Sequence, residues 1–128
     1  MKSDIESRAD IERLLDEFYK FAIHDPMIGH HFDELDLEEH LPIIADFWQK
    51  VLFGDPVYFN NPLAIHQKLH QLSPLESEHF DRWVGIFRET ADNLFAGPMA
   101  EAAKTRARMI AGNLDQRLNG HIQIDRGG

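Results

Sequence analysis

Two stretches in the second half of the chain carry a strong helical periodicity. In residues 76–95, ESEHFDRWVGIFRETADNLF, apolar side chains recur at intervals of three and four, and residues 98–119 repeat this spacing. Such spacing places the apolar residues on one face of a helix. Only a short break at Gly97 and Pro98 separates the two stretches. Helical patterns divided by such short breaks, without an internal repeat, predict a single all-α domain.

The same periodicity predicts two helices in the first half of the chain. Residues 8–24 form the first, which ends before Pro26, because a residue that precedes proline disfavours the helical conformation. Residues 37–53 form the second, with Asp36 as its N-terminal cap and Glu39 three residues further on. The stretch between them contains Pro and Gly, which predicts a short turn of helix followed by a loop.

The segment that holds two of the histidines predicts a further, short helix over about residues 61–72. His66 and His70 lie one helical turn apart in it, close enough to chelate one divalent ion. A metal site needs additional ligands, and the nearby carboxylates of Glu76 and Glu78 lie on the next predicted helix. From the residues alone, the pair indicates either a metal site or two surface histidines.

Composition and charge exclude several classes of function. The 128 residues include no cysteine, which excludes disulfides, thiolate metal sites and cysteine nucleophiles. A formal net charge of −9 opposes the electrostatic attraction on which nucleic-acid and anionic-membrane binding depend. No apolar run approaches the roughly 18 residues of a membrane span, and the N-terminus lacks the apolar core of an export signal. We therefore expect a cytoplasmic domain over residues 1–120 with a flexible tail over 121–128, no nucleic-acid or membrane partner, and a small ligand or a protein as its partner.

Four motifs along the chain resemble the truncated haemoglobins, most of all their third group. The stretch HQLSPLESEHFDRW resembles the segment that follows the proximal histidine of the family, and it places Trp83 thirteen residues after His70. The stretch EFYKFAIHDPMIGHHF resembles the family's Phe-Tyr pair, its Asp and the Phe that stacks on the porphyrin. The stretch EEHLPIIADFWQKVLFG is similar to the distal helix, and the chain from Trp83 onward is similar to the last two helices. The resemblance covers about residues 8–118.

This resemblance implies a two-over-two helical sandwich, the truncated globin fold, with haem b as its cofactor. It implies that His70 ligates the iron, with His66 one turn earlier as the alternative. In haem proteins the second ring nitrogen of such a histidine usually donates to a backbone carbonyl, which fixes the ring. The resemblance also implies that Tyr19, His40 and Trp83 face the bound ligand. The implied wall of the haem pocket is apolar and consists of Phe32, Ile44, Phe47, Leu69, Phe80, Val84 and Phe87.

The residue types of the three distal positions support the same pocket. Tyr19, His40 and Trp83 come from three different predicted helices, and a buried tyrosine hydroxyl or tryptophan N–H normally requires a partner. Three converging polar groups favour a ligand pocket. Each residue also has a structural alternative: Tyr19 bonded to a helix carbonyl, His40 facing solvent, and Trp83 within the core. If Tyr19 and Trp83 both donate to a bound ligand, they slow its escape by a factor of roughly 10² to 10⁴.

The predicted function is binding of dioxygen or another diatomic molecule, such as nitric oxide or carbon monoxide, at haem iron. Peroxidase-like or nitric oxide dioxygenase activity, served by an unknown reductase, is a further hypothesis. Two other classes of protein stay open as alternatives. One is a cofactor-free helical interaction module whose aromatic residues form its core. The other is a non-haem metal binder that uses His66 and His70.

Several charged and titratable residues near the predicted pocket have simpler assignments. His24, His30 and His31 follow the first helix and are expected to be solvated. Haem propionates require cations, and Lys68 and Arg82 are both candidates to pair with them.

Overall fold

The computed structural model describes residues 2–33, 35–58, 66, 70 and 74–119, and all regular structure within these residues is helical. Its elements are α1 (Arg8–Ala22), the 3-10 helix η1 (Gly29–Phe32), α2 (Leu37–Phe53), α4 (Ser77–Leu94) and α5 (Pro98–Asn119). The all-α prediction is confirmed. Among the described helices, none combines the length and the apolar character that a membrane crossing would require.

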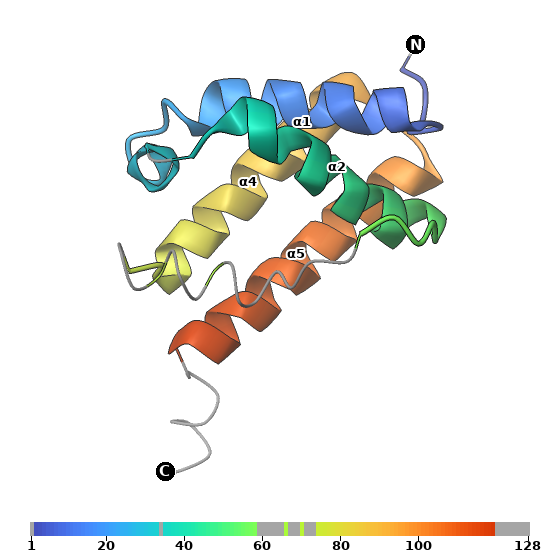
Figure 1. Ribbon diagram of the computed structural model, residues 1–128. Helices are drawn as coiled ribbons and strands as arrows, with labels where there is room; N and C mark the ends of the chain where they lie inside the picture. The colour runs from blue at the N-terminus through green and yellow to red at the C-terminus, as the bar shows by residue number, and fades with distance from the viewer. Residues whose placement is uncertain (1, 34, 59–65, 67–69, 71–73, 120–128) are drawn as a thin grey trace.

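The long helices form two pairs that cross each other (Figure 1). α1 packs against α2, and α4 packs against the antiparallel α5. The pairs are joined because α1 also contacts α4, and α2 also contacts α5. The short helix predicted over about residues 61–72 lies almost wholly outside the described residues, although His66 and His70 are both helical. The predicted tail over residues 121–128 also lies outside the described part.

α1 is held by an N-terminal cap and one continuous apolar face. The Ser7 Oγ accepts a hydrogen bond of 3.4 Å from the Asp10 N–H, a cap that the sequence analysis missed. The helix ends at Ala22, earlier than predicted. The N–H groups of His24 and Asp25 bond to carbonyls three residues back, which tightens the chain before Pro26. The buried apolar face consists of Ile11, Leu14, Leu15, Phe18, Tyr19 and Ala22.

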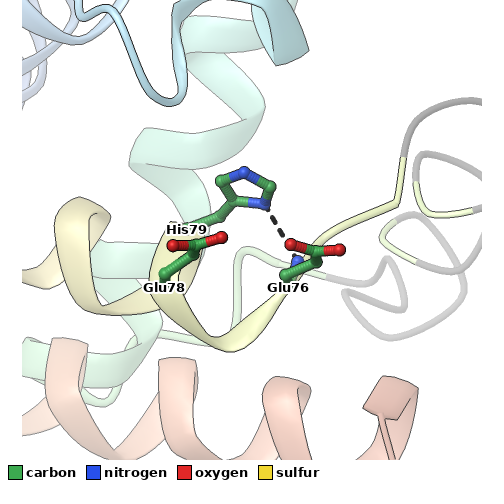
Figure 2. A group of neighbouring side chains, drawn as sticks. All are labelled: Glu76, Glu78 and His79. Atoms are coloured by element: carbon green, nitrogen blue, oxygen red, sulfur yellow. Dashed lines mark hydrogen bonds between the residues drawn. The ribbon is translucent and has the colours of Figure 1, made fainter.

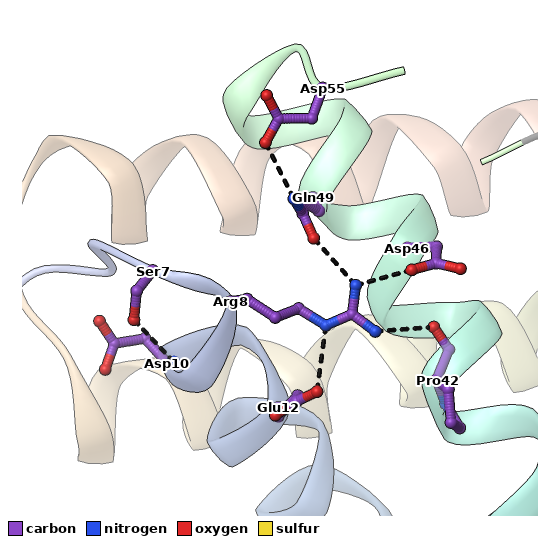
Figure 3. Close-up of polar contacts among 8 residues, drawn as sticks. All are labelled: Ser7, Arg8, Asp10, Glu12, Pro42, Asp46, Gln49 and Asp55. Carbon is purple, nitrogen blue, oxygen red and sulfur yellow. Dashed lines mark hydrogen bonds and ion pairs between the residues drawn. The ribbon is translucent and has the colours of Figure 1, made fainter. Parts of the chain in front are cut away.

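The guanidinium of Arg8 joins α1 to α2 (Figure 3). Its Nη1 donates to Asp46 (2.6 Å) and to Gln49 (2.9 Å), and its Nη2 donates to the Pro42 carbonyl (3.1 Å). Its Nε donates to Glu12 on α1 itself (3.1 Å). The rigid fork of donors therefore fixes the contact between the two helices beside the proline, which is itself unable to donate a helical hydrogen bond.

α2 begins and ends as predicted. The Asp36 carboxylate accepts a bond of 3.4 Å from the Glu39 N–H, and Gly54 ends the helix in the left-handed conformation with a φ of 76°. Glycine adopts this conformation at the C-terminus of a helix without the steric cost of a side chain.

α4 and α5 approach each other closely because α5 has small residues on its inner face. Ala103 and Ala107 have no exposed surface, and Ala100 and Ala111 have almost none. Small side chains at a helix contact shorten the distance between the two axes. Both helices agree with their predicted ranges to within one residue at each end.

The N-terminal segment, residues 2–5, returns to the start of α5. The Asp4 carboxylate accepts bonds from the N–H groups of Met99 (2.9 Å) and Ala100 (2.8 Å). Gly97 precedes the helix with a φ of 142°, and a Cβ at this position would lie 2.5 Å from the Asp4 side chain. The close approach of Asp4 therefore requires glycine at position 97.

Candidate functional site

An aromatic cluster fills the region where α1, α2 and α4 meet. Phe87 is fully buried and stacks on Trp48, with ring centroids 5.0 Å apart, and on Trp83, with centroids 5.5 Å apart. Phe18 meets Trp83 edge-on at 5.8 Å. Such ring pairs are stabilised beyond the burial of their area, so they hold each other in defined positions. The cluster thereby orients the two polar aromatic side chains at its edge, Tyr19 and Trp83.

Tyr19 is buried but its hydroxyl has no hydrogen-bond partner among the described residues. Its ring meets Phe18 edge-on at 4.8 Å and Phe32 of η1 at 5.5 Å, and only 9% of the residue is exposed. Burial raises the pKa of the Tyr19 hydroxyl, so the group stays protonated and able to donate. A bond from this hydroxyl to a helix carbonyl, the structural alternative considered above, does not occur within the described part of the chain.

Trp83 and His40 come from two further helices. Trp83 lies on α4, is half-buried, and forms no hydrogen bond through its indole N–H to any described residue. His40 lies in the first turn of α2, is half-buried, and its ring likewise has no hydrogen bond to the described residues. Tyr19 and Trp83 both contact Phe18, so the structure brings these two together. It gives no ring contact between His40 and either of them, and a shared role for all three stays a prediction.

The two candidate iron ligands, His66 and His70, are both half-buried. The Nδ1 of His70 accepts a hydrogen bond of 2.9 Å from the Leu75 N–H. A nitrogen that accepts carries no proton, so the neutral ring holds its proton on Nε2. The expected donation to a backbone carbonyl is therefore not seen. Leu75 is buried and lies just before α4, so its N–H has no helical carbonyl to bond to. This N–H uses Nδ1 of His70 as its acceptor instead.

Three of the apolar residues assigned to the pocket wall pack against the aromatic core. Phe32 from η1 and Ile44 and Phe47 from α2 are all half-buried there. Phe47 also meets Trp48 edge-on at 5.7 Å. These side chains lie on the same core as Tyr19 and Trp83.

The remaining wall residues differ in their surroundings. Phe80 and Val84 belong to a second apolar cluster, which includes Leu114 of α5. Phe87 is stacked between Trp48 and Trp83 and has no exposed surface, so it packs against Trp83 instead of lining a pocket directly. Leu69 lies outside the described residues.

Comparison with known proteins shows which known fold this arrangement of helices resembles. No protein-family model matches the chain. A group 3 truncated haemoglobin of Campylobacter jejuni is 27% identical over 124 residues, which cover 92% of this chain and 95% of that protein. A crystal structure of the group III truncated haemoglobin from Campylobacter jejuni superimposes with a TM-score of 0.81 at the same identity and over the same shares of the two chains. The chain has the truncated haemoglobin fold. The resemblance to the third group and the two-over-two helical sandwich are thereby confirmed.

Within this truncated haemoglobin fold, Asp25 and Arg82 hold the turn before η1 against α4. Arg82 Nε and Nη2 donate to Asp25 Oδ1 (2.8 and 2.7 Å), and Oδ2 accepts from the N–H groups of Met27 and Ile28 (3.0 and 3.2 Å). The Arg82 guanidinium, helped by these N–H groups, holds the pKa of the buried Asp25 carboxyl below its usual value. Arg82, a predicted partner of the haem propionates, is thus engaged by Asp25. Lys68, the other candidate, lies outside the described residues.

Of the three histidines that follow α1 in this truncated haemoglobin fold, one was misjudged from the sequence. His24 and His30 are exposed as expected. His31 is half-buried, and its Nε2 lies 3.2 Å from the Pro74 carbonyl, so the expectation that it is solvated is wrong. The partner is 43 residues away along the chain, and no local pattern could indicate the contact.

Proposed function

We propose that the chain is a haem protein that binds dioxygen or another diatomic molecule, such as nitric oxide or carbon monoxide. The observation that carries this proposal is the pair of donors at the edge of the aromatic cluster. The Tyr19 hydroxyl and the Trp83 indole N–H have no partner among the described residues, although both lie beside Phe18. Donors at the edge of an apolar cluster that bond to no described residue are available to a ligand. The likeness to a truncated haemoglobin over most of the chain supports the same ligand class.

Haem b, when bound, would supply an iron atom with a coordination position for the diatomic ligand. We propose that His70 holds it from the proximal side, with His66 as the alternative. For Nε2 of His70 to become the ligand atom, its proton must leave, and the neutral ring then carries a proton on Nδ1 instead. Nδ1 can take this proton only after it releases the Leu75 N–H. Haem binding is therefore expected to change the turn between His70 and Leu75.

The distal side chains would act as donors inside an apolar pocket. Tyr19 stays protonated because burial raises its pKa, and the indole of Trp83 can only donate. Both suit a ligand on which negative charge develops, since a bond to a charged acceptor is stronger than a neutral one. His40 would add a third polar group from α2. The rings of Phe32 and Phe47 would exclude water from the site.

Peroxidase-like activity or oxidation of nitric oxide by dioxygen is the finer form of the proposal. Donors that hold a ligand tightly suit redox turnover better than rapid unloading. Such turnover requires a reductase that supplies electrons to the haem. Purified haem-loaded protein, supplied with a generic reductase system, should turn over peroxide or nitric oxide faster than the same concentration of free haem. Turnover equal to that of free haem for both substrates would contradict the enzymatic form of the proposal.

An absorption spectrum tests the haem proposal itself. After expression with a haem supply, the purified protein should show an intense band at about 400 to 430 nm. If the band is absent despite haem supply, the proposal fails. A cofactor-free interaction module would then be favoured if the protein also binds no metal. A non-haem metal site at His66 and His70 would be favoured if metal binding is lost in a His66→Asn variant.

A further inference from the structure

Three histidine rings gather between η1 and the first turn of α4. The ring centroids of His30 and His31 are 4.0 Å apart, those of His31 and His79 are 4.7 Å apart, and those of His30 and His79 are 6.0 Å apart. With Zn–N bonds of about 2.0–2.1 Å in tetrahedral geometry, the centroids of two ligating rings lie about 5 Å apart. The three centroid distances fall on both sides of this value. To bind one ion, the rings of His30 and His31 would have to turn toward His79, because among the described residues only Glu76, Glu78 and His79 already have their ligand atoms within 4.8 Å of one another.

His31 already has the bonding pattern of a metal-binding histidine. Its Nε2 lies 3.2 Å from the carbonyl oxygen of Pro74, which can only accept, so Nε2 carries the proton and donates. Its Nδ1 therefore holds a lone pair, and this atom is buried without any hydrogen-bond partner. Metal-ligating histidines usually donate their second ring N–H to a backbone carbonyl or a carboxylate, which orients the ring.

The surroundings of His79 add carboxylates to the same place (Figure 2). Glu76, Glu78 and His79 each place one potential ligand atom within 4.8 Å of the others. The Nδ1 of His79 accepts a bond of 2.9 Å from the Glu76 N–H. A metal ion would have to replace this bond or use the other nitrogen. His30 is exposed and its ring makes no hydrogen bond to a described residue, so the ring can turn toward the ion.

We propose that His30, His31 and His79 bind one divalent transition-metal ion of the zinc class, with a carboxylate from Glu76 or Glu78 at the fourth position. Imidazole nitrogens and carboxylate oxygens are the ligands that zinc accepts in a chain without cysteine. This ion would clamp η1 to the start of α4, beside the contact that Asp25 already makes with Arg82. The site is separate from the proposed haem ligands and does not depend on haem.

The experiment is a calorimetric titration of the full-length, chelator-treated protein with Zn²⁺, with and without haem. Wild type should bind one Zn²⁺ at this site in both forms. His30→Asn and His31→Asn should each weaken binding by at least about tenfold, because loss of even an outer partner of a metal ligand costs 10- to 100-fold. His24→Asn is the matched control, since His24 is an exposed histidine on the same stretch but outside the cluster, and it should bind as wild type does. Thermal unfolding of each variant confirms that it is folded, and the exposed His30 makes its variant less disruptive than that of the half-buried His31.

Three results would overturn this site. The first is the absence of stoichiometric Zn²⁺ binding to the wild type. The second is wild-type affinity in both His30→Asn and His31→Asn. The third is binding that is lost in a Glu76→Gln, Glu78→Gln double variant but kept in both histidine variants, which would place the ion on the carboxylates alone.

Discussion

At the scale of the residue, the most informative atoms are polar ones that lack a partner within the described structure. The Tyr19 hydroxyl and the Trp83 N–H stand beside a packed aromatic cluster, and Nδ1 of His31 is buried with its lone pair unused. Protein interiors rarely leave a buried atom such as Nδ1 of His31 unbonded, whereas the two donors stand at the edge of the cluster. Tyr19 and Trp83 were identified from the resemblance of the sequence to the truncated haemoglobins, and their residue types supported that assignment. The state of His31 was not, because it depends on the Pro74 carbonyl, which is distant along the chain.

Replacing Tyr19 with phenylalanine should separate its function from its packing. If the hydroxyl donates to the ligand, Tyr19→Phe should speed dioxygen dissociation by about tenfold or more, since a bond of at least about 1.4 kcal/mol is lost. The haem-free stability should stay within about 0.5 kcal/mol of wild type, because the hydroxyl bonds to no described residue. Stopped-flow kinetics and chemical unfolding measure the two effects. Tyr58→Phe, which alters the other buried tyrosine, is the control and should leave the dissociation rate unchanged. If the rate is also unchanged in Tyr19→Phe, Tyr19 has only a packing role.

The two candidate iron ligands should respond differently to alanine. His70→Ala should abolish stable haem binding, whereas His66→Ala should leave the absorption spectrum nearly unchanged. Imidazole added to the His70→Ala protein should restore a haem spectrum, because it can occupy the space left by the side chain and supply the missing nitrogen. Loss of the spectrum in His66→Ala alone would move the iron ligand one turn earlier.

At the scale of the element, helix ends distinguish what local sequence can predict from what it cannot. The cap of α2 was predictable because the Asp36 carboxylate accepts from the N–H of Glu39, which is only three residues away. The cap of α5 was not, because Asp4 lies 95 residues before Met99, to which it bonds. The end of α1 was predicted two residues too far along the chain. Pro26 indicates that the helix must stop, but it does not indicate that the N–H groups of His24 and Asp25 bond to carbonyls three residues back.

Removing the distant cap should weaken the whole fold. Asp4→Ala deletes the acceptor for the first N–H groups of α5, and we expect a loss of about 1–2 kcal/mol in the free energy of unfolding. Burial raises the pKa of Asp4, but the N–H groups of Met99, Ala100 and Ile5 outweigh it, so the pKa is lowered overall. Its stabilisation is therefore present above the unfolded value of 3.8 and disappears as the pH falls through the lower folded value.

Denaturant unfolding of Asp4→Ala at neutral pH and at acidic pH measures both effects. The control is Asp16→Ala, which removes an exposed carboxylate on α1 and should change stability by no more than about 0.5 kcal/mol. Equal stability losses in the two variants at neutral pH would contradict the capping role.

At the scale of the whole molecule, the crossing of two helix pairs follows from the apolar faces seen in the sequence. The alanine face of α5 and the aromatic face of α4 are both periodic, so their pairing could be anticipated. The contacts that fasten the pairs to each other could not. Arg8 reaches α2, and Arg82 reaches the turn before η1, through side chains whose partners are 34 to 57 residues away.

The stability of the folded molecule should depend on pH through His31. Burial is the main cause that lowers the pKa of His31. The neighbouring His30 and His79 lower it further, and the backbone of Pro74 and of Ile28 opposes them. The unfolded chain then takes up a proton at His31 more readily than the folded one. The contribution of His31 to the free energy of unfolding should therefore be constant at pH values above its ordinary pKa of 6.5. It should decrease as the pH falls below that value.

Chelator-treated wild type and His31→Asn should be compared by denaturant unfolding between about pH 5 and pH 7.5. The variant should lose part of the pH dependence in this window, and His24→Asn should keep all of it. Parallel curves for wild type and His31→Asn would show that burial of His31 does not govern the effect.

The return of residues 2–5 to the start of α5 has a consequence for biosynthesis. Ser3 accepts a bond from the Ala96 N–H, and Asp4 accepts bonds from the N–H groups of Met99 and Ala100, so this segment cannot complete its contacts until α4 and the start of α5 exist. At about 5–20 residues per second, Asp4 waits roughly 5 to 20 s after its own synthesis for Met99 to be made. Residues 2–5 are thus made before both helix pairs but complete their native contacts only after them, and a ribosome-bound chain truncated before α5 should leave these residues accessible to protease.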